Sequence, residues 1–166
     1  MEKLLEIEKA RIIEYRSEYK EKVIEHLTNV IIEELKFEDW RCGIENVETN
    51  VKEYIEKKGN FWLAINENDD AAGTIGLRIV NEEIAEIKYF YLKEDYRGTG
   101  LAQRLFNTCV DFAKLNKYKK IILYTCEKCG RAINFYKKNN FIQFERIVNY
   151  GGVEKVGKSY VFEKCI

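Results

Sequence analysis

The chain has 166 residues, of which 46% are apolar and 13% aromatic, and this is enough to build the core of one domain over residues 1–166. Basic and acidic residues number 28 each, so there is no bulk basic field to hold nucleic acid or an anionic membrane. Residues 1–9 are charged too often for a signal peptide, and no uncharged run reaches the length of a membrane span. We therefore expect a cytoplasmic protein whose partners are small molecules.

Residue types that bind metals or act as nucleophiles are few. The five cysteines are an odd number and lie far apart, which favours reduced thiols over a disulfide framework. Cys126 and Cys129 form a C-x-x-C pair without a second pair or a nearby histidine, so we expect no metal. His26, the only histidine, falls near the polar side of a predicted helix, and neither Ser17 nor Ser159 has the context of a hydrolase nucleophile. We interpret His26 as a structural residue.

The first predicted elements are a strand and two helices. Residues 11–16 are typical of a strand, and Ser17 can cap a helix that runs to about Lys36, because apolar residues recur there on one helical face. A second helix is predicted over residues 47–57. The intervening segment 37–40 combines acidic and aromatic side chains. It is interpreted as a solvated loop with an aromatic anchor, with a pocket for a cationic amine as the alternative.

The rest of the chain alternates between predicted strands and helices. Apolar residues return at helical spacing from Leu101 until Asn116. The element order implies an α/β fold with a mixed, mostly antiparallel, twisted sheet of about seven strands and helices on both faces. The expected elements are strands over residues 61–65, 73–80 and a segment ending at 92, a strand over 120–125, a helix over 131–139, and strands over 141–149 and 159–165 joined across Gly151-Gly152.

A glycine-rich turn between the strand that ends at Leu92 and the following helix is the most informative feature. Glycines there let the backbone approach a ligand, and the helix begins with unpaired N–H groups and a positive dipole end. Phosphate suits such a position. A Rossmann fingerprint would need glycine in place of Gln103, and a Walker loop would need Gly-Lys-Ser/Thr in place of Gly100-Leu101-Ala102, so both classes are excluded.

The remaining pattern, Arg97-Gly98-Thr99-Gly100-Leu101-Ala102, resembles the acetyl-CoA pyrophosphate loop of the GCN5-related N-acetyltransferase (GNAT) family, Arg/Gln-x-x-Gly-x-Gly/Ala. The later run from Arg131 to Phe141 is similar to that family's Ala-x-x-(Phe/Leu)-Tyr-x-Lys-x-Gly-Phe motif, with Asn140 in place of glycine. Asparagine also adopts the left-handed conformation that ends a helix, so this departure is mild. The resemblance covers about residues 60–145 and implies the acyl-CoA N-acyltransferase fold.

The resemblance also implies where acetyl-CoA, the co-substrate, is bound. The diphosphate is expected on the backbone N–H groups that open the helix, with help from Arg97, and the alternative is an ordinary solvated turn. The pantetheine arm is expected to pair like an added strand at a point where the fourth and fifth strands splay apart. Cys129 stands where the family commonly has an asparagine that touches the cofactor, and a thiol cannot replace the amide donors. The implied cofactor-binding residues are Tyr91, Leu92, Arg97, Gly98, Thr99, Gly100, Leu101, Ala102, Cys129 and Tyr136.

Two residues match catalytic positions of the family. Tyr136 corresponds to the tyrosine that acts as general acid, and a phenol with a pKa near 10 suits protonation of a departing thiolate, although tyrosine is also a common core residue. Glu86 lies where some members hold a glutamate general base; the alternatives are a solvated edge position, an ion pair with Lys88, or ordered waters as the base. Simple alternation puts Glu86, Lys88, Phe90 and Leu92 on one face of the strand and Ala85, Ile87, Tyr89 and Tyr91 on the other.

We therefore expect an acetyl-CoA-dependent N-acetyltransferase that moves an acetyl group directly to a primary amine in a ternary complex. The expected acceptor is a small molecule, with a protein N-terminus or lysine as the alternative. A module that binds coenzyme A or a partner without turnover is the alternative from another class, because Cys129 replaces the usual asparagine. Pairing of two copies through the final strands, which would make a homodimer, stays open.

Overall fold

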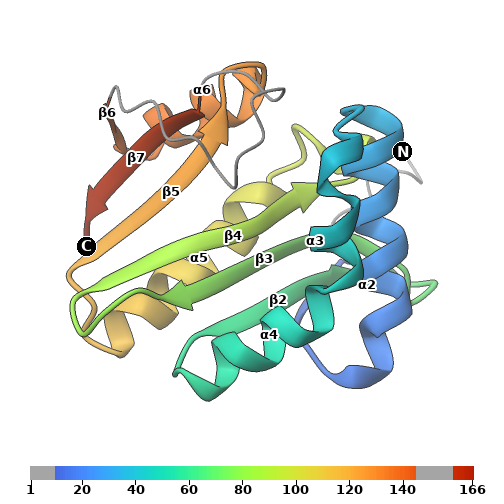
Figure 1. Ribbon diagram of the computed structural model, residues 1–166, viewed down its shortest axis with the longest axis horizontal. Helices are drawn as coiled ribbons and strands as arrows, with labels where there is room; N and C mark the ends of the chain where they lie inside the picture. Colours follow the sequence, from blue (N-terminus) through green and yellow to red (C-terminus); the bar gives the residue numbers. More distant parts are fainter. Residues whose placement is uncertain (1–9, 145–158) are drawn as a thin grey trace.

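A computed structural model describes residues 10–144 and 159–166. Its strands form one seven-stranded sheet in the order β1-β2-β3-β4-β5-β7-β6 (Figure 1). β4 and β5 run parallel, and every other neighbouring pair is antiparallel, so the predicted mixed, mostly antiparallel sheet is confirmed. The strands are β1 (Arg11–Glu14), β2 (Asn60–Ile65), β3 (Ala71–Ile79), β4 (Ile84–Leu92), β5 (Lys120–Cys126), β6 (Ile142–Phe144) and β7 (Ser159–Cys165).

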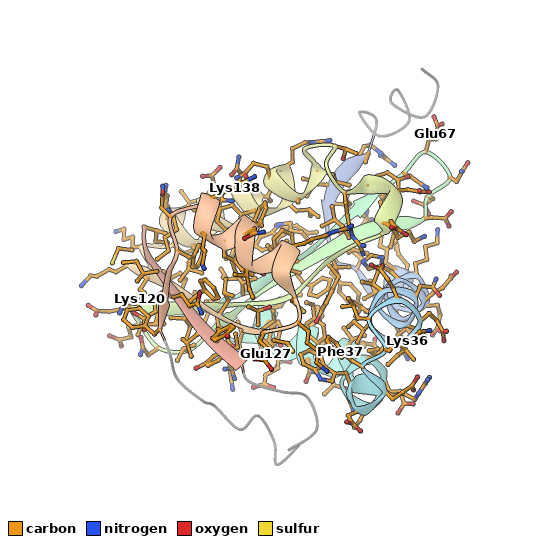
Figure 2. All side chains as sticks on the ribbon, turned by 90° about the horizontal axis from the view of Figure 1, so that it is seen from above. Lys36, Phe37, Glu67, Lys120, Glu127 and Lys138 are labelled. Carbon is orange, nitrogen blue, oxygen red and sulfur yellow. The ribbon has the colours of Figure 1, made fainter. Side chains whose placement is uncertain are left out.

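Helices cover both faces of the sheet, as predicted. One apolar cluster joins the sheet to α5 through Leu105 and Cys109, and the other joins it to α2 and α4 through Val23 and Val51. Figure 2 shows these layers from above, with Lys138 at the end of α6 on one side and Lys36 and Phe37 on the other. The helical segments are η1 (Ser17–Tyr19), α2 (Lys20–Leu27), η2 (Thr28–Glu34), η3 (Glu38–Trp40), α3 (Arg41–Glu45), α4 (Val47–Glu56), η4 (Glu94–Tyr96), α5 (Leu101–Leu115) and α6 (Gly130–Lys138).

The first predicted helix is less regular than its apolar spacing suggests. Ser17 makes no side-chain cap, because it lies inside the 3-10 turn η1, and α2 begins only at Lys20. The second half, η2, is π-helical, with Leu35 N–H donating to Val30 O at its end. The predicted loop after it also contains two short helical segments, η3 and α3. The wide π turn keeps Val30, Ile31 and Ile32 buried together, which an ideal α-helical face would not.

A β-bulge in β4 overturns the predicted alternation of its side chains. Thr74 of β3 pairs with Tyr91 and Gly76 pairs with Lys88, so β4 contains one residue more than β3 between these two pairs. Tyr89, which lies in this stretch, has a φ of 51°. The extra residue shifts the pattern by one. Phe90 and Leu92 therefore pack in the cluster that contains α5, whereas Tyr89 and Tyr91 pack in the opposite cluster. The prediction that Phe90 and Leu92 share a face with Glu86 is wrong for this reason.

The final hairpin is described only in part. β6 and β7 pair antiparallel, and β7 lies between β5 and β6. The predicted turn at Gly151-Gly152 lies outside the described residues. Asn140 has a φ of 62°, so the left-handed cap expected after α6 is confirmed.

Candidate functional site

The two parallel strands in the middle of the sheet separate toward their carboxyl ends. β4 pairs with β5 only from Ile84 opposite Lys120 to Glu86 opposite Ile122, although β4 continues to Leu92 and β5 to Cys126. Figure 1 shows the two strands diverging beyond this point. The splayed strands implied by the sequence resemblance are therefore present, and we call the space after Glu86 the β4–β5 gap.

Backbone groups at the end of β4 face this gap. Lys93 N–H donates to Ala72 O at 3.0 Å, so the backbone of Lys93 points toward β3. Because peptide directions alternate along a strand, the N–H and C=O of Leu92 point to the opposite edge, the edge of the gap, and those of Tyr91 point toward β3. Of the two β4 residues expected beside the pantetheine arm, Leu92 is the one whose backbone faces the gap.

The glycine turn leads from this strand end into α5. Gly98 and Gly100 have φ values of 75° and 87°, which residues other than glycine rarely adopt, and a Cβ atom on either would meet no atom within 4 Å. Among the described residues, none accepts a hydrogen bond from the amides of Gly98, Gly100 or Ala102. Thr99 Oγ1 donates to Tyr96 O at 2.7 Å and stabilises the turn from inside. The turn therefore presents open amides at the positive end of a fifteen-residue helix.

Arg97 is engaged by protein groups. Its guanidinium pairs with the Glu34 carboxylate of η2 in a two-bond contact, one bond being 2.6 Å from Nη2 to Oε2, and Nη2 also donates to Leu92 O at 2.9 Å. Arg97 thus ties the glycine turn to the end of β4 and to η2. The sequence-based interpretation assigned this side chain only to phosphate, and the contact with Glu34, 63 residues away, had no local signal.

Tyr136 lies on α6 against the gap. Its ring is 6% exposed and contacts the rings of Phe90 of β4, Phe141 and Phe162 of β7. Burial, reinforced by the neighbouring Cys129, raises the pKa of the phenol well above its usual value, so it is protonated at neutral pH. The structure therefore makes Tyr136 a core aromatic and leaves it a weak acid beside β4.

Cys129 directly precedes α6 and is half-buried. It is the residue before the first turn of the helix, and its N–H donates to Cys126 O at 2.9 Å. Burial and the neighbouring Cys126 raise the pKa of its thiol, and a hydrogen bond with Thr125 opposes this. A thiol with a raised pKa stays protonated and is a poor nucleophile or metal ligand at neutral pH. All five cysteines lie within the described residues, and all are free thiols.

The acetyltransferase (GNAT) family model matches residues 21–141 of the chain, which is well over half of its length. The chain belongs to the GNAT family. Among solved structures, an acetyltransferase from Streptococcus agalactiae 2603 matches with a TM-score of 0.83 at 26% identity, covering 95% of this chain and 99% of that one. The PaiA N-acetyltransferase from Thermoplasma acidophilum, solved in complex with coenzyme A, matches with a TM-score of 0.76 at 20% identity over 94% and 98% of the two chains. Its likeness shows the fold alone.

Curated relatives match this GNAT chain over shorter stretches. The N-acetylaspartate synthetase of Xenopus tropicalis is 29% identical over 103 residues, which are 60% of this chain and 38% of the relative. Probable N-acetyltransferase 14 of the same species is 28% identical over 78 residues, 46% of this chain and again 38% of the relative. The match thus spans less than two fifths of either relative. In the described part of the chain, none of the helices has the length and apolar character needed to cross a membrane.

Glu86 marks the start of the gap in this GNAT fold, because it is the last β4 residue paired with β5. It is fully buried, Arg78 Nε donates to its Oε2 at 2.9 Å, and Lys88 Nζ lies 3.4 Å from its Oε1. The ion pair with Lys88, one of the sequence-based alternatives, is therefore present, and the partner Arg78 from β3 was not foreseen. These two cations compensate the buried charge.

His26 lies elsewhere than expected. The prediction near the polar side of the first helix is wrong, because the side chain is 1% exposed and packs between α2 and the end of β4. Its Nε2 is 3.3 Å from Tyr91 O, and burial lowers the pKa of the imidazole to about 4 with help from the charges of Lys93 and Arg97. The available sequence signal was its spacing of three residues from buried Val23.

The segment between the first two predicted helices fits the solvated interpretation with an aromatic anchor. Phe37 packs against the core and its ring lies 5.9 Å from that of Trp40, which is 40% exposed. Glu38 pairs with Arg41 at 3.1 Å on the surface.

A surface groove of about 740 Å³ lies at the other end of the sheet. Its walls come from the end of α4, the turn after β3 and the end of α5, and include Lys58, Val80 and Asn116. Because the glycine turn is at the start of α5 and Asn116 follows its end, the full length of that helix separates the groove from the candidate site.

Proposed function

We propose that this GNAT protein is an acetyl-CoA-dependent N-acetyltransferase built as a single domain. The observation that carries the proposal is the set of open amides at Gly98, Gly100 and Ala102, placed beside the β4–β5 gap. Backbone N–H groups at a helix N-terminus bind a diphosphate well. Family membership and two fold neighbours solved with acetyl-CoA or coenzyme A bound support the same ligand.

The geometry suits coenzyme A in one orientation. The diphosphate would lie on the amides of Gly98–Ala102, and the pantetheine arm would enter the gap along the edge of β4 at Leu92, whose N–H faces the gap while its carbonyl accepts from Arg97, like a strand added to β4. The thioester would then lie between β4 and the α6 residue Tyr136. Arg97, already paired with Glu34, would contribute mainly through its bond to Leu92 O, which holds the end of β4 beside the glycine turn.

Acyl transfer from a thioester to an amine needs a proton taken from the amine and one given to the departing thiolate. Tyr136, protonated at neutral pH, is the proposed donor to the thiolate sulfur. Glu86, at the start of the gap, is the proposed base, acting on the amine directly or through ordered water. Transfer is proposed to be direct in a ternary complex, because the raised pKa of Cys129 disfavours that thiol as an acyl carrier.

A primary amine on a small molecule is the proposed acceptor. The name of one relative, N-acetylaspartate synthetase, indicates an amino acid as acceptor in that protein and supports this class. A protein N-terminus or lysine is the alternative acceptor. A silent coenzyme-binding module is the alternative function, and the observation behind it is that Cys129 offers no amide donor.

The test combines catalysis and binding. The protein is incubated with acetyl-CoA and a panel of small amines and peptides, free thiol is measured, and coenzyme A binding is measured by calorimetry and thermal shift. A ligand at 100 times its Kd stabilises the folded state by about 2.7 kcal/mol, so an upward shift in melting temperature is expected. Binding without thiol release on any acceptor would support the silent module, and the absence of heat at millimolar coenzyme A would contradict the proposal.

A matched pair of variants tests the glycine turn itself. Asparagine and aspartate both tolerate positive φ and have the same shape, and the space around Gly98 is open. We expect Gly98→Asn to retain coenzyme binding and Gly98→Asp to weaken it about tenfold or more, because the added carboxylate repels the diphosphate. Equal affinities for the two variants would remove the turn from the binding site.

A further inference from the structure

The Tyr91–Leu92 peptide group links His26 to the β4–β5 gap. The carbonyl of Tyr91 and the N–H of Leu92 belong to one planar trans peptide unit, so they point in opposite directions. His26 Nε2 contacts the carbonyl at 3.3 Å, and the Leu92 N–H faces the gap. A hydrogen bond that fixes the direction of the Tyr91 carbonyl therefore also fixes the direction of the Leu92 N–H.

The contact determines the form of the imidazole. A carbonyl only accepts hydrogen bonds, so Nε2 carries the proton and Nδ1 is a bare acceptor. Nδ1 is buried and has no hydrogen-bond partner among the described residues, and the positive charges of Lys93 and Arg97 disfavour a second proton there. A leucine would fill this apolar site without an unpaired nitrogen, so packing alone does not account for a histidine.

The end of β4 is paired on one side only, with Tyr91 opposite Thr74 and Leu92 opposite Gly73 of β3. Beyond Glu86 the strand has lost its neighbour β5, and the bulge at Tyr89 interrupts its register with β3. Arg97 holds the next carbonyl along, that of Leu92, so adjacent peptide units are both fixed by side chains. A hydrogen bond on a carbonyl also polarises its peptide unit and makes the N–H at the other end a stronger donor.

We propose that His26 is a positioning residue for coenzyme binding: its Nε2–H orients the Tyr91–Leu92 peptide so that Leu92 N–H donates to an amide carbonyl of the pantetheine arm. The inference rests on the proposed function, because it needs a coenzyme in the gap. It assigns the histidine a role in ligand affinity in addition to its place in the core. His26 touches no reacting atom and acts only through the peptide.

Two variants separate positioning from packing. His26→Gln keeps an N–H donor at about the same reach, and His26→Leu keeps apolar bulk without a donor. We expect His26→Leu to raise the Kd for coenzyme A and the KM for acetyl-CoA about tenfold, with kcat at saturation nearly unchanged. His26→Gln should stay within about threefold of the parent, whatever it costs in melting temperature.

An NMR experiment on the unmodified protein keeps the inference falsifiable if His26→Leu fails to fold. The chain has one histidine, so its imidazole nitrogens give unambiguous signals. We expect the Nε2-protonated tautomer, and shifts of both the imidazole and the Leu92 amide when coenzyme A is added. Coenzyme binding with unmoved imidazole signals, or equal affinity in the leucine and glutamine variants, would overturn the role of His26 alone. Failure of the parent to bind coenzyme A would overturn the proposed function and this inference together.

Discussion

Tyr136 combines a packing role with a proposed chemical one. Its ring completes an aromatic cluster that includes Phe90 and Phe141, and burial keeps its phenol protonated. The cluster holds the ring beside β4 in one orientation, and a general acid needs that positioning because proton transfer requires hydrogen-bond reach. The core interpretation and the catalytic one are therefore compatible for this residue.

Tyr136→Phe separates the two roles. The ring and its contacts remain, so we expect stability and the Kd for coenzyme A to change little. Loss of a general acid typically costs about 10²-fold to 10⁴-fold in rate, so kcat should fall by about 10²-fold or more in a thiol-release assay. Unchanged turnover would remove Tyr136 from the mechanism.

Of the two cationic partners of Glu86, only Lys88 could be predicted from the sequence. Lys88, two positions along the strand, was a foreseeable partner because it lies on the same face. Arg78 was not, because its approach depends on the β3–β4 register, in which Arg78 stands directly opposite Glu86. A register is decided by pairing along both strands together, so neither strand alone reveals it.

At the scale of the element, the bulge in β4 lies just beyond Glu86, the last residue that β4 pairs with β5. Thr74 is fully buried, and its Oγ1 donates to Tyr89 O at 2.7 Å. The Tyr89 phenol accepts from Asn50 Nδ2 at 2.7 Å and donates to Gly43 O at 3.1 Å, so α3 and α4 hold the bulge from the other side. These bonds stabilise a left-handed residue that would otherwise be strained.

Substitution of Thr74 tests this support. Thr74→Val removes the hydroxyl and leaves the Tyr89 carbonyl without that donor, at a cost of about 1–3 kcal/mol in unfolding free energy. We expect coenzyme A affinity to fall as well, because Leu92, the residue proposed to pair with the pantetheine arm, follows the bulge on the same strand. Calorimetry and chemical denaturation measure the two effects.

Thr74→Ser is the matched control. It keeps the hydroxyl but loses a buried methyl group, which costs about 1 kcal/mol in stability. Coenzyme A affinity should therefore stay near that of the parent in Thr74→Ser, which keeps the hydroxyl, even though this variant is less stable. If Thr74→Ser weakened coenzyme A binding as much as Thr74→Val, the role given to this hydrogen bond would be contradicted.

At the scale of the whole molecule, His26 makes stability depend on pH. Burial lowers its pKa to about 4 in the folded state from 6.5 in the unfolded chain, so the unfolded chain binds more protons between these values. Stability is therefore fully present above pH 6.5 and is lost as the pH falls toward 4. From pH 7 to pH 5 this histidine should remove about 2 kcal/mol of unfolding free energy.

Comparison of the parent with His26→Gln isolates that effect. Carboxylates whose pKa values are lowered by lysine partners, such as Glu48 and Glu83, also lose stabilisation in acid, but they do so equally in both proteins. The parent's unfolding free energy minus that of His26→Gln should therefore shrink or change sign from pH 7 to pH 5. A constant difference would show that His26 is not a buried neutral imidazole.

Local sequence determined the order of the elements, the covering of both faces of the sheet by helices, and the family motifs. Apolar spacing follows from helix and strand geometry, and the positive φ values at Gly98 and Gly100 favour glycine, so these features are visible in short windows. Only the tertiary structure decided the bulge at Tyr89, the burial of His26 and the pairing of Arg97 with Glu34. Each of those depends on contacts between residues far apart in the chain, and their energies exist only once the strands and helices have packed.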